Sequence, residues 1–347
     1  MKLNIPFNSP HIINNEISNI KKASNLNSFS ANGYFTKKCE KFLKIKLKSK
    51  EALLVNSCTA ALEMCALLLN IKKGDQIIMP SFTFVSSANA FVLRGGVPVF
   101  VDIDPKTCNI EANKIENLIS KKTKVILVVH YAGISCDMEP ILKIAKKYKL
   151  FVIEDMAHAF LSSYKKKPLG SIGDLATISF HETKNIHCGE GGALLINNPV
   201  FINRSKVLRD KGTNRELFNK NLVRKYTWID LGSSYGLSEI NAAFLHGQLL
   251  QSNKITKRRK KIFDIYHKEL KLLEIKGLIK RPTVPNYSAY NGHIYYILIY
   301  NKKRKLLVDY LKKKISRQYF IMCLFIHLHL VKKRFNKNYA EKHKQYF

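Results

Sequence analysis

The stretch DLATISFHETKNIHCGEGGALLI, residues 174–196, decides the fold of this chain. It contains an apolar run, LATISF, a polar turn, HETKN, a glycine-rich turn, GEGG, and a second apolar run, ALLI. Short apolar runs bounded by turn residues are typical of buried strands. We therefore predict two strands that flank a loop carrying a single lysine, Lys184.

A lysine held between two strands has a chemical use. Its amine can form a Schiff base with an aldehyde if the site lowers its pKa. The nearby glycines, Gly189, Gly191 and Gly192, would let the backbone approach a bulky group closely. The alternative is that Lys184 is an ordinary solvated lysine in a lysine-rich chain.

A second stretch, LFVIEDMAH at residues 150–158, favours the chemical interpretation. It reads as a buried strand that ends in an acidic pair. A carboxylate at the carboxyl end of a parallel strand lies where α/β folds bind ligands. A Schiff-base lysine and a strand-end aspartate form the pairing that pyridoxal phosphate enzymes require. We expect Asp155 to keep the pyridine nitrogen of this cofactor protonated.

The remaining apolar runs complete a fold prediction. A strand followed by a helix is expected in each of residues 52–69 and 76–91, and further strands in 97–104 and 125–133, which with the three above makes seven strands. Helical patterns lie between them, including Tyr34–Leu47, Ile115–Ile119 and Met138–Tyr148. Alternation of strands and helices predicts an α/β fold, a mostly parallel sheet with helices on both faces. This large domain would span residues 1–248.

Residues 249–347 are expected to form a smaller α+β domain. A long basic helix, Leu249–Leu270, leads to a strand in HIYYILIY, residues 293–300, and to a helix in RKLLVDYLKKK, residues 304–314. The later run Tyr319–Val331 is apolar, but it is too short for a membrane span and contains two histidines.

The charge and cysteine content of the chain indicate which partners and which compartment to expect. The net charge of +34 is consistent with binding of nucleic acid or a membrane surface. The lysines, however, are spread along the whole chain and no nucleic-acid motif is present, so we expect neither partner. Seven scattered cysteines and the absence of a signal-peptide pattern favour a cytoplasmic protein.

The stretch HETKN, residues 181–185, begins like the zinc motif HExxH. Asn185 stands where that motif needs its second histidine. His181, His187 and Cys188 do not have a zinc-binding spacing. No metal is predicted.

Many segments in order resemble the DegT/DnrJ/EryC1/StrS sugar-nucleotide aminotransferases. They are PFNSP (6–10), NSCTAALEMCALLL (56–69), GDQIIMPSFTFVSSANAFVLRGGVPVFVDIDP (74–105), VVHYAGISCDM (128–138), VIEDMAHA (152–159), SFHETKN (179–185), GEGGALLIN (189–197), RDKGTNR (209–215) and YTWIDLGSSYGLSEINAA (226–243). The resemblance runs nearly unbroken from Ile5 to about Gln248 and weakens beyond it. It implies fold-type I pyridoxal phosphate enzymes, with seven strands in the large domain.

The resemblance also implies roles for residues. Cys58 and Thr59 would bind the cofactor phosphate at the start of a helix that Ser57 or Thr59 caps, and Ser179 would bind it as well. Phe84 would stack on the pyridine ring, and His158 would lie near the phenolic oxygen. The site residues expected for the cofactor are therefore Cys58, Thr59, Phe84, Asp155, His158, Ser179 and the catalytic Lys184.

The reaction implied is transfer of an amine from L-glutamate to C4 of a nucleotide-linked 4-keto-6-deoxy sugar. The resemblance favours dTDP-4-dehydro-6-deoxy-D-glucose, converted to dTDP-4-amino-4,6-dideoxy-D-galactose for a cell-envelope glycan. A related dehydratase that uses pyridoxamine phosphate is disfavoured, because such relatives carry histidine where this chain has Lys184. A non-catalytic protein with this fold is disfavoured by intact Lys184 and Asp155.

Two further expectations concern assembly and the end of the chain. Relatives form homodimers in which a loop completes the neighbour's site; here that loop would be Ser233–Gly236. Many relatives have asparagine where Gly236 stands, so Ser233, Ser234 and Tyr235 are candidates to replace it. The chain ends earlier than such relatives do, and its end is divergent, so we expect an impaired small domain.

Overall fold

The computed structural model describes residues 3–4, 8–27, 29–299 and 304–316. Its centre is a seven-stranded sheet in the order β2-β10-β9-β6-β5-β3-β4. The strands are β2 (Glu51–Val55), β3 (Gln76–Pro80), β4 (Val97–Val101), β5 (Thr123–Val129), β6 (Phe151–Asp155), β9 (Leu175–Ser179) and β10 (Gly192–Ile196). Only β10 is antiparallel to its neighbours. The predicted α/β fold with seven strands is confirmed.

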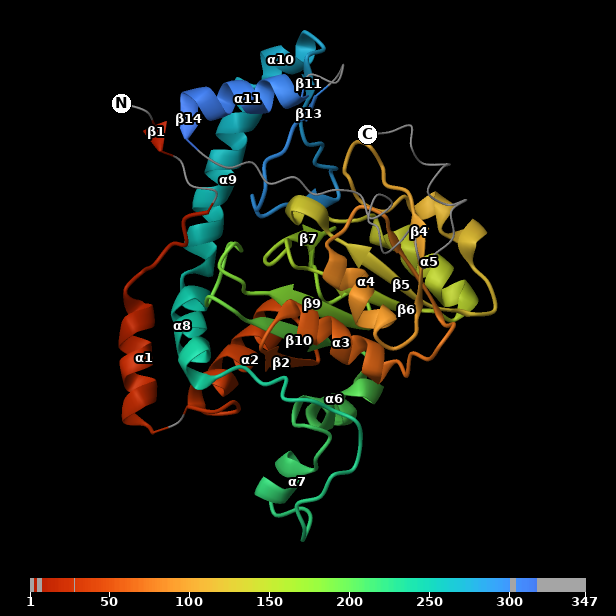
Figure 1. Ribbon diagram of the computed structural model, residues 1–347, viewed down its shortest axis with the longest axis vertical. Coiled ribbons are helices and arrows are strands. Elements are labelled where there is room, and N and C mark those ends of the chain that lie inside the picture. Colours follow the sequence, from red (N-terminus) through yellow and green to blue (C-terminus); the bar gives the residue numbers. More distant parts are fainter. Residues whose placement is uncertain (1–2, 5–7, 28, 300–303, 317–347) are drawn as a thin grey trace.

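The sheet is apolar on both faces because helices cover both. One face packs against α1 (Asn15–Asn25), α2 (Tyr34–Leu47), α5 (Met138–Tyr148) and α8 (Glu239–Leu250), and the other against α3 (Cys58–Leu68), α4 (Val85–Val92) and α6 (Ile202–Arg209) (Figure 1). Successive residues of a strand enter opposite cores, as Leu53 and Leu54 do. The predicted helices 34–47 and 138–148 are confirmed.

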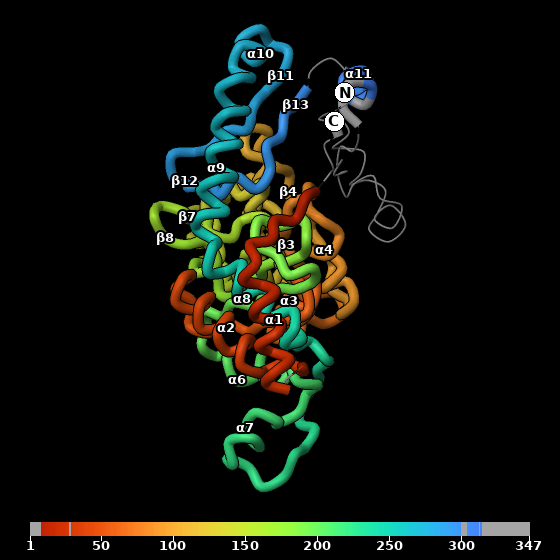
Figure 2. Tube along the Cα trace, turned by 90° about the vertical axis from the view of Figure 1, so that its left-hand side faces the viewer, coloured from red at the N-terminus to blue at the C-terminus, as the bar shows by residue number. Residues whose placement is uncertain are grey.

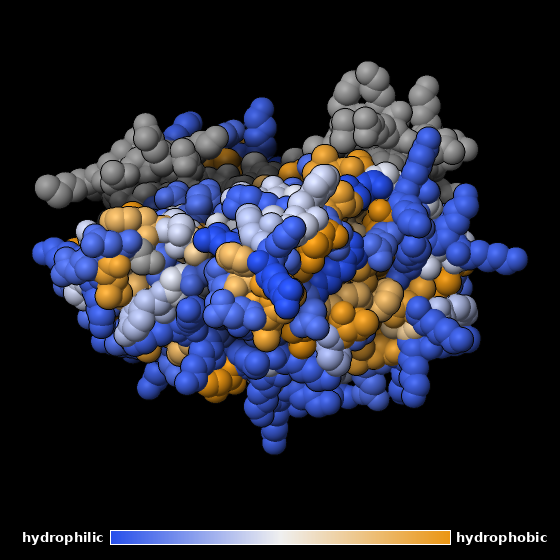
Figure 3. Space-filling view, turned by 90° about the horizontal axis from the view of Figure 1, so that it is seen from below, coloured by the Kyte–Doolittle hydropathy of each residue, from blue (hydrophilic) through white to orange (hydrophobic). Residues whose placement is uncertain are grey.

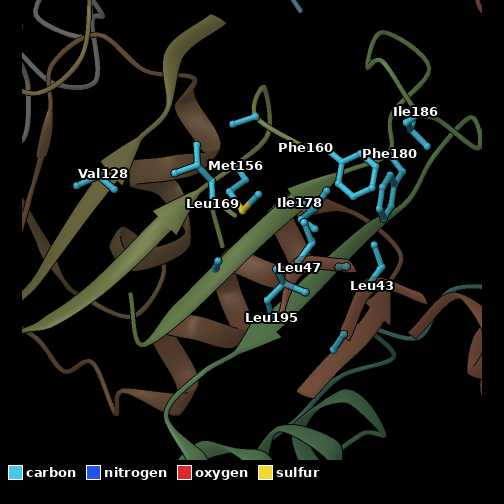
Figure 4. Packing of buried hydrophobic residues seen from close by; sticks show 14 of the residues in the cluster. Leu43, Leu47, Val128, Met156, Phe160, Leu169, Ile178, Phe180, Ile186 and Leu195 are labelled. Carbon is cyan, nitrogen blue, oxygen red and sulfur yellow. The ribbon is translucent and has the colours of Figure 1, made fainter. Parts of the chain in front are cut away.

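The larger core extends beneath the loop that carries Lys184. Phe160 and Phe180 meet edge to face with ring centroids 5.9 Å apart, and Ile186 lies beside them (Figure 4). Phe180 and Ile186 are almost completely buried. These apolar anchors hold the polar turn between β9 and β10 in one position.

The predicted helix Ile115–Ile119 is wrong. This region forms two short 3-10 turns, η1 (Ala112–Lys114) and η2 (Glu116–Leu118), and Ile119 is already extended. A segment this short has too few intrahelical hydrogen bonds to offset the cost of nucleating an α-helix. Two other 3-10 turns are η3 (Tyr131–Gly133) and η4 (Pro199–Phe201).

The second part of the molecule is built on a long helix, α9 (Ser252–Glu269), which runs from α8 to α10 (Lys271–Ile275) (Figure 2). The basic helix expected at 249–270 is confirmed as α9. It begins at Ser252, because the chain is not helical at Gln251, which separates α9 from α8. Other elements are β7 (Ser163–Tyr164), β8 (Lys167–Pro168), β11 (Ile279–Lys280), β12 (Ser288–Ala289), β13 (Leu298–Ile299) and the predicted helix α11 (Arg304–Lys314). The division into domains at residue 248 remains a prediction.

The predicted strand 293–300 is largely wrong. Within the described residues only Leu298 and Ile299 pair, with β11. The residues before them bind the large domain instead: the Tyr296 ring lies 5.6 Å from the Tyr131 ring, and His293 hydrogen-bonds Asn185. These tertiary contacts replace the regular ladder that the alternating pattern favours.

The two ends of the described chain meet in a short parallel pair of β1 (Leu3–Asn4) and β14 (Ile315–Ser316). The divergent end expected from the sequence, including 319–331, lies outside the described residues. Among the helices of the described part, none is long and apolar enough to cross a membrane.

Candidate active site

The acidic pair of β6 divides between two faces of the strand. Asp155 ends the strand, and Ser87 donates a hydrogen bond to its Oδ2 at 2.8 Å. The backbone amide of Ala157 donates to its Oδ1 at 3.0 Å. Thr83 in turn lies 2.8 Å from the Ser87 hydroxyl. Burial raises the pKa of the Asp155 carboxyl, while these hydrogen bonds and Lys184 oppose that rise. Asp155 is thus a fixed carboxylate beside Lys184.

Glu154 has a structural role on the opposite face. Its carboxylate accepts hydrogen bonds from the amides of Gly170, Ile172 and Gly173 at 2.7–2.9 Å and from His130 at 3.1 Å. Its side chain has no exposed surface. Burial alone would raise its pKa, but the His130 and backbone hydrogen bonds bring the pKa below its usual value. Glu154 therefore holds the 170–173 turn and does not face Lys184.

Lys184 lies in the turn after β9, where its amide donates to the carbonyl of His181 at 2.9 Å. Burial lowers the pKa of its amine, and the nearby Cys58 and Asp155 act in the opposite direction. The structure thus brings together three of the predicted residues, which are more than 25 residues apart in sequence. A partly desolvated amine beside a carboxylate is suited to nucleophilic attack on an aldehyde.

The start of α3 supplies an anion site. Ser57 caps this helix by accepting a hydrogen bond from the amide of Ala60 at 3.0 Å, which decides between the two predicted caps. The first two helical amides, those of Cys58 and Thr59, have no acceptor among the described residues. The Thr59 hydroxyl donates to Ser86 at 2.9 Å. Free amides at a helix N-terminus favour a phosphate.

A glycine brings the neighbouring strand against this helix start. A Cβ atom on Gly192 would lie 2.4 Å from the carbonyl carbon of Ser57 and 2.5 Å from the amide nitrogen of Cys58. Ser179, paired with Gly192 across the strands, accepts a weak hydrogen bond from the His181 amide at 3.4 Å. No acceptor for the Ser179 hydroxyl proton lies in the described part of the chain. Ser179 is therefore paired with the glycine that lies against the start of α3 at Ser57 and Cys58.

A histidine pair closes the site from the side of α9. The rings of His158 and His293 lie 4.7 Å apart, and His158 Nδ1 accepts from the Ala132 amide at 3.4 Å. Burial lowers the pKa of both imidazoles well below the ordinary value, and the Lys184 charge adds to this effect. Both histidines are thus neutral near pH 7.

His293 and its supports were not predicted as site residues. The side-chain oxygen of Asn185, next to Lys184, accepts a hydrogen bond from His293 Nδ1 at 2.8 Å, and its amide nitrogen donates to the carbonyl of Asn291 at 3.2 Å. Asn291 donates to the carbonyls of His158 and Phe160. This network ties the segment after α9 to the Lys184 turn. The tripeptide Asn-Gly-His at 291–293 was its only sequence signal.

Two aromatic residues after β3 have different environments. Phe82 is buried, with its ring 4.9 Å from that of Tyr131. Phe84 is 58% exposed at the start of α4. Phe82 is therefore part of the core, whereas Phe84, the residue predicted to stack on a cofactor ring, has a free face.

The residues present fit pyridoxal phosphate. They provide a desolvated amine, a buried carboxylate, free helix amides and an exposed aromatic face, which match its aldehyde, ring nitrogen, phosphate and ring. Within the described residues no three His, Cys, Asp or Glu side chains are grouped so as to hold a metal. His181 interacts with Thr183 and lies 3.5 Å from Glu190.

Comparisons with known proteins agree with this chemistry. The family model described as the DegT/DnrJ/EryC1/StrS aminotransferase family matches residues 10–345, well past the region where motifs are recognisable. The protein MJ1066 of Methanocaldococcus jannaschii is 40% identical over 287 residues, 80% of this chain and 73% of that protein. GDP-perosamine synthase of Escherichia coli O157:H7 is 35% identical over 270 residues, 78% of this chain and 72% of the synthase.

A solved structure shows the same fold. The PLP form of the Streptococcus pneumoniae protein Spr1654, assigned as a sugar aminotransferase, superposes with a TM-score of 0.85 at 27% identity, covering 95% of this chain and 88% of that one. Together with the geometry around Lys184, these findings show that the chain belongs to the DegT/DnrJ/EryC1/StrS aminotransferase family and is a pyridoxal phosphate-dependent enzyme.

Proposed function

We propose that the enzyme transfers an amine from L-glutamate to C4 of a nucleotide-linked 4-keto-6-deoxy-hexose. The observation that carries this proposal is the partly buried Lys184 amine near the fixed Asp155 carboxylate, in a chain similar to a GDP-perosamine synthase. Pyridoxal phosphate, when bound, supplies an electron sink that stabilises negative charge at the carbon next to the transferred nitrogen.

Lys184 is proposed to have two tasks. Its amine holds the cofactor covalently, and after release the same amine moves a proton to and from the reacting carbon. Partial burial supports both tasks, because the lowered pKa increases the fraction of neutral amine. Asp155, fixed by Ser87 and Ala157, would keep the pyridine nitrogen protonated.

The surrounding residues are proposed to orient the cofactor. The amides of Cys58 and Thr59 and the hydroxyl of Ser179 would bind the phosphate. Phe84 would cover one face of the ring, and neutral His158 would lie near the phenolic oxygen. Burial raises the pKa of the Cys58 thiol, so we assign it no thiolate chemistry.

The acceptor sugar is the finer part of the proposal. The sequence motifs favour dTDP-4-dehydro-6-deoxy-D-glucose, giving dTDP-4-amino-4,6-dideoxy-D-galactose. The runner-up is a GDP-linked sugar, because GDP-perosamine synthases are among the similar proteins. Dehydration is disfavoured by lysine at position 184, and loss of catalysis by the intact pair of Lys184 and Asp155.

We further propose a homodimer. Residues 215–231, which include α7 (Arg215–Asn219), project from the end of the molecule opposite α10 (Figures 1 and 2). Apolar side chains on this arm are exposed: Leu222, Tyr226, Trp228, Ile229 and Leu231 at 49–75%. Figure 3, which views this end, shows apolar groups among the charged ones. Exposed apolar groups of this number support a binding surface.

The base of the arm adjoins the site. The Asn56 amide donates to the carbonyl of Tyr235 at 2.8 Å, and Gly236 bridges to Val55 next to α3. The end of the predicted interface loop, Ser233–Gly236, thus lies beside residues 55–56, just before the helix start that we propose binds the phosphate. A partner arm lying across this region would complete each site.

The proposal is tested with purified enzyme, L-glutamate and a panel of dTDP- and GDP-linked 4-keto-6-deoxy sugars. Formation of 2-oxoglutarate together with a 4-amino sugar, identified by mass and NMR, is the expected result. The Lys184→Ala variant should lose both turnover and the yellow colour of the lysine-bound cofactor. Full turnover by this variant, or no amination of any panel member by the wild type, would refute the proposal.

A further inference from the structure

A second cavity lies apart from Lys184, between the end of α2, the β7–β8 hairpin and α9. Its volume is about 750 Å³, within the range of small-molecule sites. Lys46 and Leu47 form one wall, Ser163 and Pro168 another, and α9 a third. None of the residues assigned to the cofactor lines it.

The cavity has an excess of positive charge. Lys46, Lys257, Lys260 and Lys261 line it together with one carboxylate, Asp264. None of these four lysines makes an ion pair with an acidic group among the described residues. Most lysines of the chain are spread over its surface, whereas these four line the same cavity. Mutual repulsion in such a space favours a bound anion.

A buried threonine, Thr256, also belongs to the cavity lining and is only 8% exposed. Its Oγ1 is covered by neighbouring protein atoms and is not open to the cavity. The four ammonium groups are therefore the donors that the cavity offers to phosphate oxygens.

The one carboxylate is already engaged. The Tyr290 hydroxyl donates to Asp264, and the Lys260 ammonium lies 5.1 Å from the centre of the Tyr290 ring. Asp264 therefore orients the aromatic wall and offsets only part of the charge. Three positive charges remain after it is counted, because four lysines face one aspartate.

We propose that this cavity is a binding site for a small phosphorylated anion carrying about three negative charges, of the diphosphate type. The lysines act as point charges and donate the hydrogen bonds to the phosphate oxygens. A depression bounded by three elements and open to solvent favours a small molecule over a nucleic-acid strand or a membrane surface. This site is independent of the transamination proposed above.

A ligand bound in this cavity would affect the active site through the segment that follows Tyr290. Tyr290 precedes Asn291, whose side chain donates to the carbonyls of His158 and Phe160. The backbone of Gly292 is packed so closely on Arg259 that an added Cβ would lie 2.8 Å from its carbonyl carbon. A ligand that fixes α9 therefore also fixes the segment carrying His293.

The test is calorimetric titration of the cofactor-loaded enzyme with inorganic pyrophosphate at constant ionic strength. The cavity variant is Lys257→Met with Lys260→Met, and the matched control is Lys254→Met with Lys268→Met on the same helix. We expect saturable binding that weakens at least tenfold in the cavity variant and less than twofold in the control.

Three results would overturn the proposal: no saturable binding, equal weakening in both double variants, or loss of all binding on saturation with the sugar nucleotide. The second would assign binding to diffuse charge, and the third to the catalytic site. Unchanged thermal unfolding of each variant checks that the fold is intact.

Discussion

At the scale of single residues, the site depends on two neighbouring carboxylates with separate roles. Asp155 interacts electrostatically with Lys184, whereas Glu154 holds the turn 170–173 and His130. Sequence alone predicted Asp155 but left Glu154 as the next candidate. The two differ because adjacent strand residues point to opposite faces of a sheet.

This difference gives a paired prediction. Asp155→Ala should slow transamination by several orders of magnitude, since the ring nitrogen loses the carboxylate that keeps it protonated. Glu154→Gln should instead lower the free energy of unfolding by about 3 kcal/mol or more, because it breaks a buried charge network. Single-turnover rates and urea unfolding of both variants measure this. Near-normal rates in Asp155→Ala would mean that the wrong carboxylate was assigned.

A second residue-scale prediction concerns the histidine pair. The folded-state pKa values of His158 and His293 lie well below the ordinary value of 6.5. In the unfolded chain both take up protons as pH falls through about 6.5, whereas in the folded protein they stay neutral. The stability that these two histidines contribute should therefore be fully present above pH 7 and be lost as pH drops below 6.5, by up to about 1.4 kcal/mol per histidine per pH unit.

Urea unfolding at pH 7.5, 6.5 and 5.5 checks this dependence. The His293→Gln variant should show a shallower loss between pH 6.5 and 5.5, while the exposed His11→Gln variant should match the wild type. Identical slopes in all three proteins would contradict the assignment. His293 itself could not be predicted from sequence, because its contacts with Asn185 and His158 join residues more than 100 positions apart.

At the scale of elements, the spacing of apolar residues predicted strands and helices correctly where long apolar patterns coincide with buried segments. The sequences of the central strands and of helices such as α2 and α5 have continuous apolar patterns, and the structure forms these elements at the expected places. The pattern failed for Ile115–Ile119 and for 293–300. The first is too short to nucleate a helix, and in the second the alternating side chains bind Tyr131 and Asn185 rather than a partner strand.

The close contact between β10 and the start of α3 predicts the effect of a substitution at Gly192. Gly192→Ala places a methyl group 2.4–2.6 Å from the backbone of Ser57 and Cys58, which is closer than atoms can approach. We expect the helix start to be displaced, with at least a tenfold weaker affinity for pyridoxal phosphate and a lower melting temperature.

Ser57→Ala serves as the comparison. It removes only the cap of α3 and should cost about 1 kcal/mol in stability with a smaller loss of affinity. Cofactor titration followed by absorbance, with thermal unfolding of each apoprotein, separates the two variants. Unaltered cofactor affinity in Gly192→Ala would show that close approach of β10 does not shape the phosphate site.

At the scale of the whole molecule, the arm at residues 215–231 is the feature that a single chain does not explain. Its apolar residues, Trp228 above all at 75% exposure, are turned outward, although the core is otherwise well filled. The family resemblance gave the expectation of a dimer, but no local pattern identifies which exposed groups meet a partner. Association depends on the three-dimensional surface rather than on periodicity.

The proposed dimer predicts that Leu222→Ser with Trp228→Ser shifts the protein toward monomer, because burial of both side chains on a partner is lost. The matched control is Leu272→Ser with Ile275→Ser on α10, which removes two equally exposed apolar groups, at 67% and 69%, from the opposite end. Sedimentation across a hundredfold range of concentration should show dimer in the wild type and control but dissociation in the arm variant. Activity per chain should fall with the dimer fraction in that variant, since each site would lack its neighbour's contribution. A monomeric wild type with full activity would exclude this assembly.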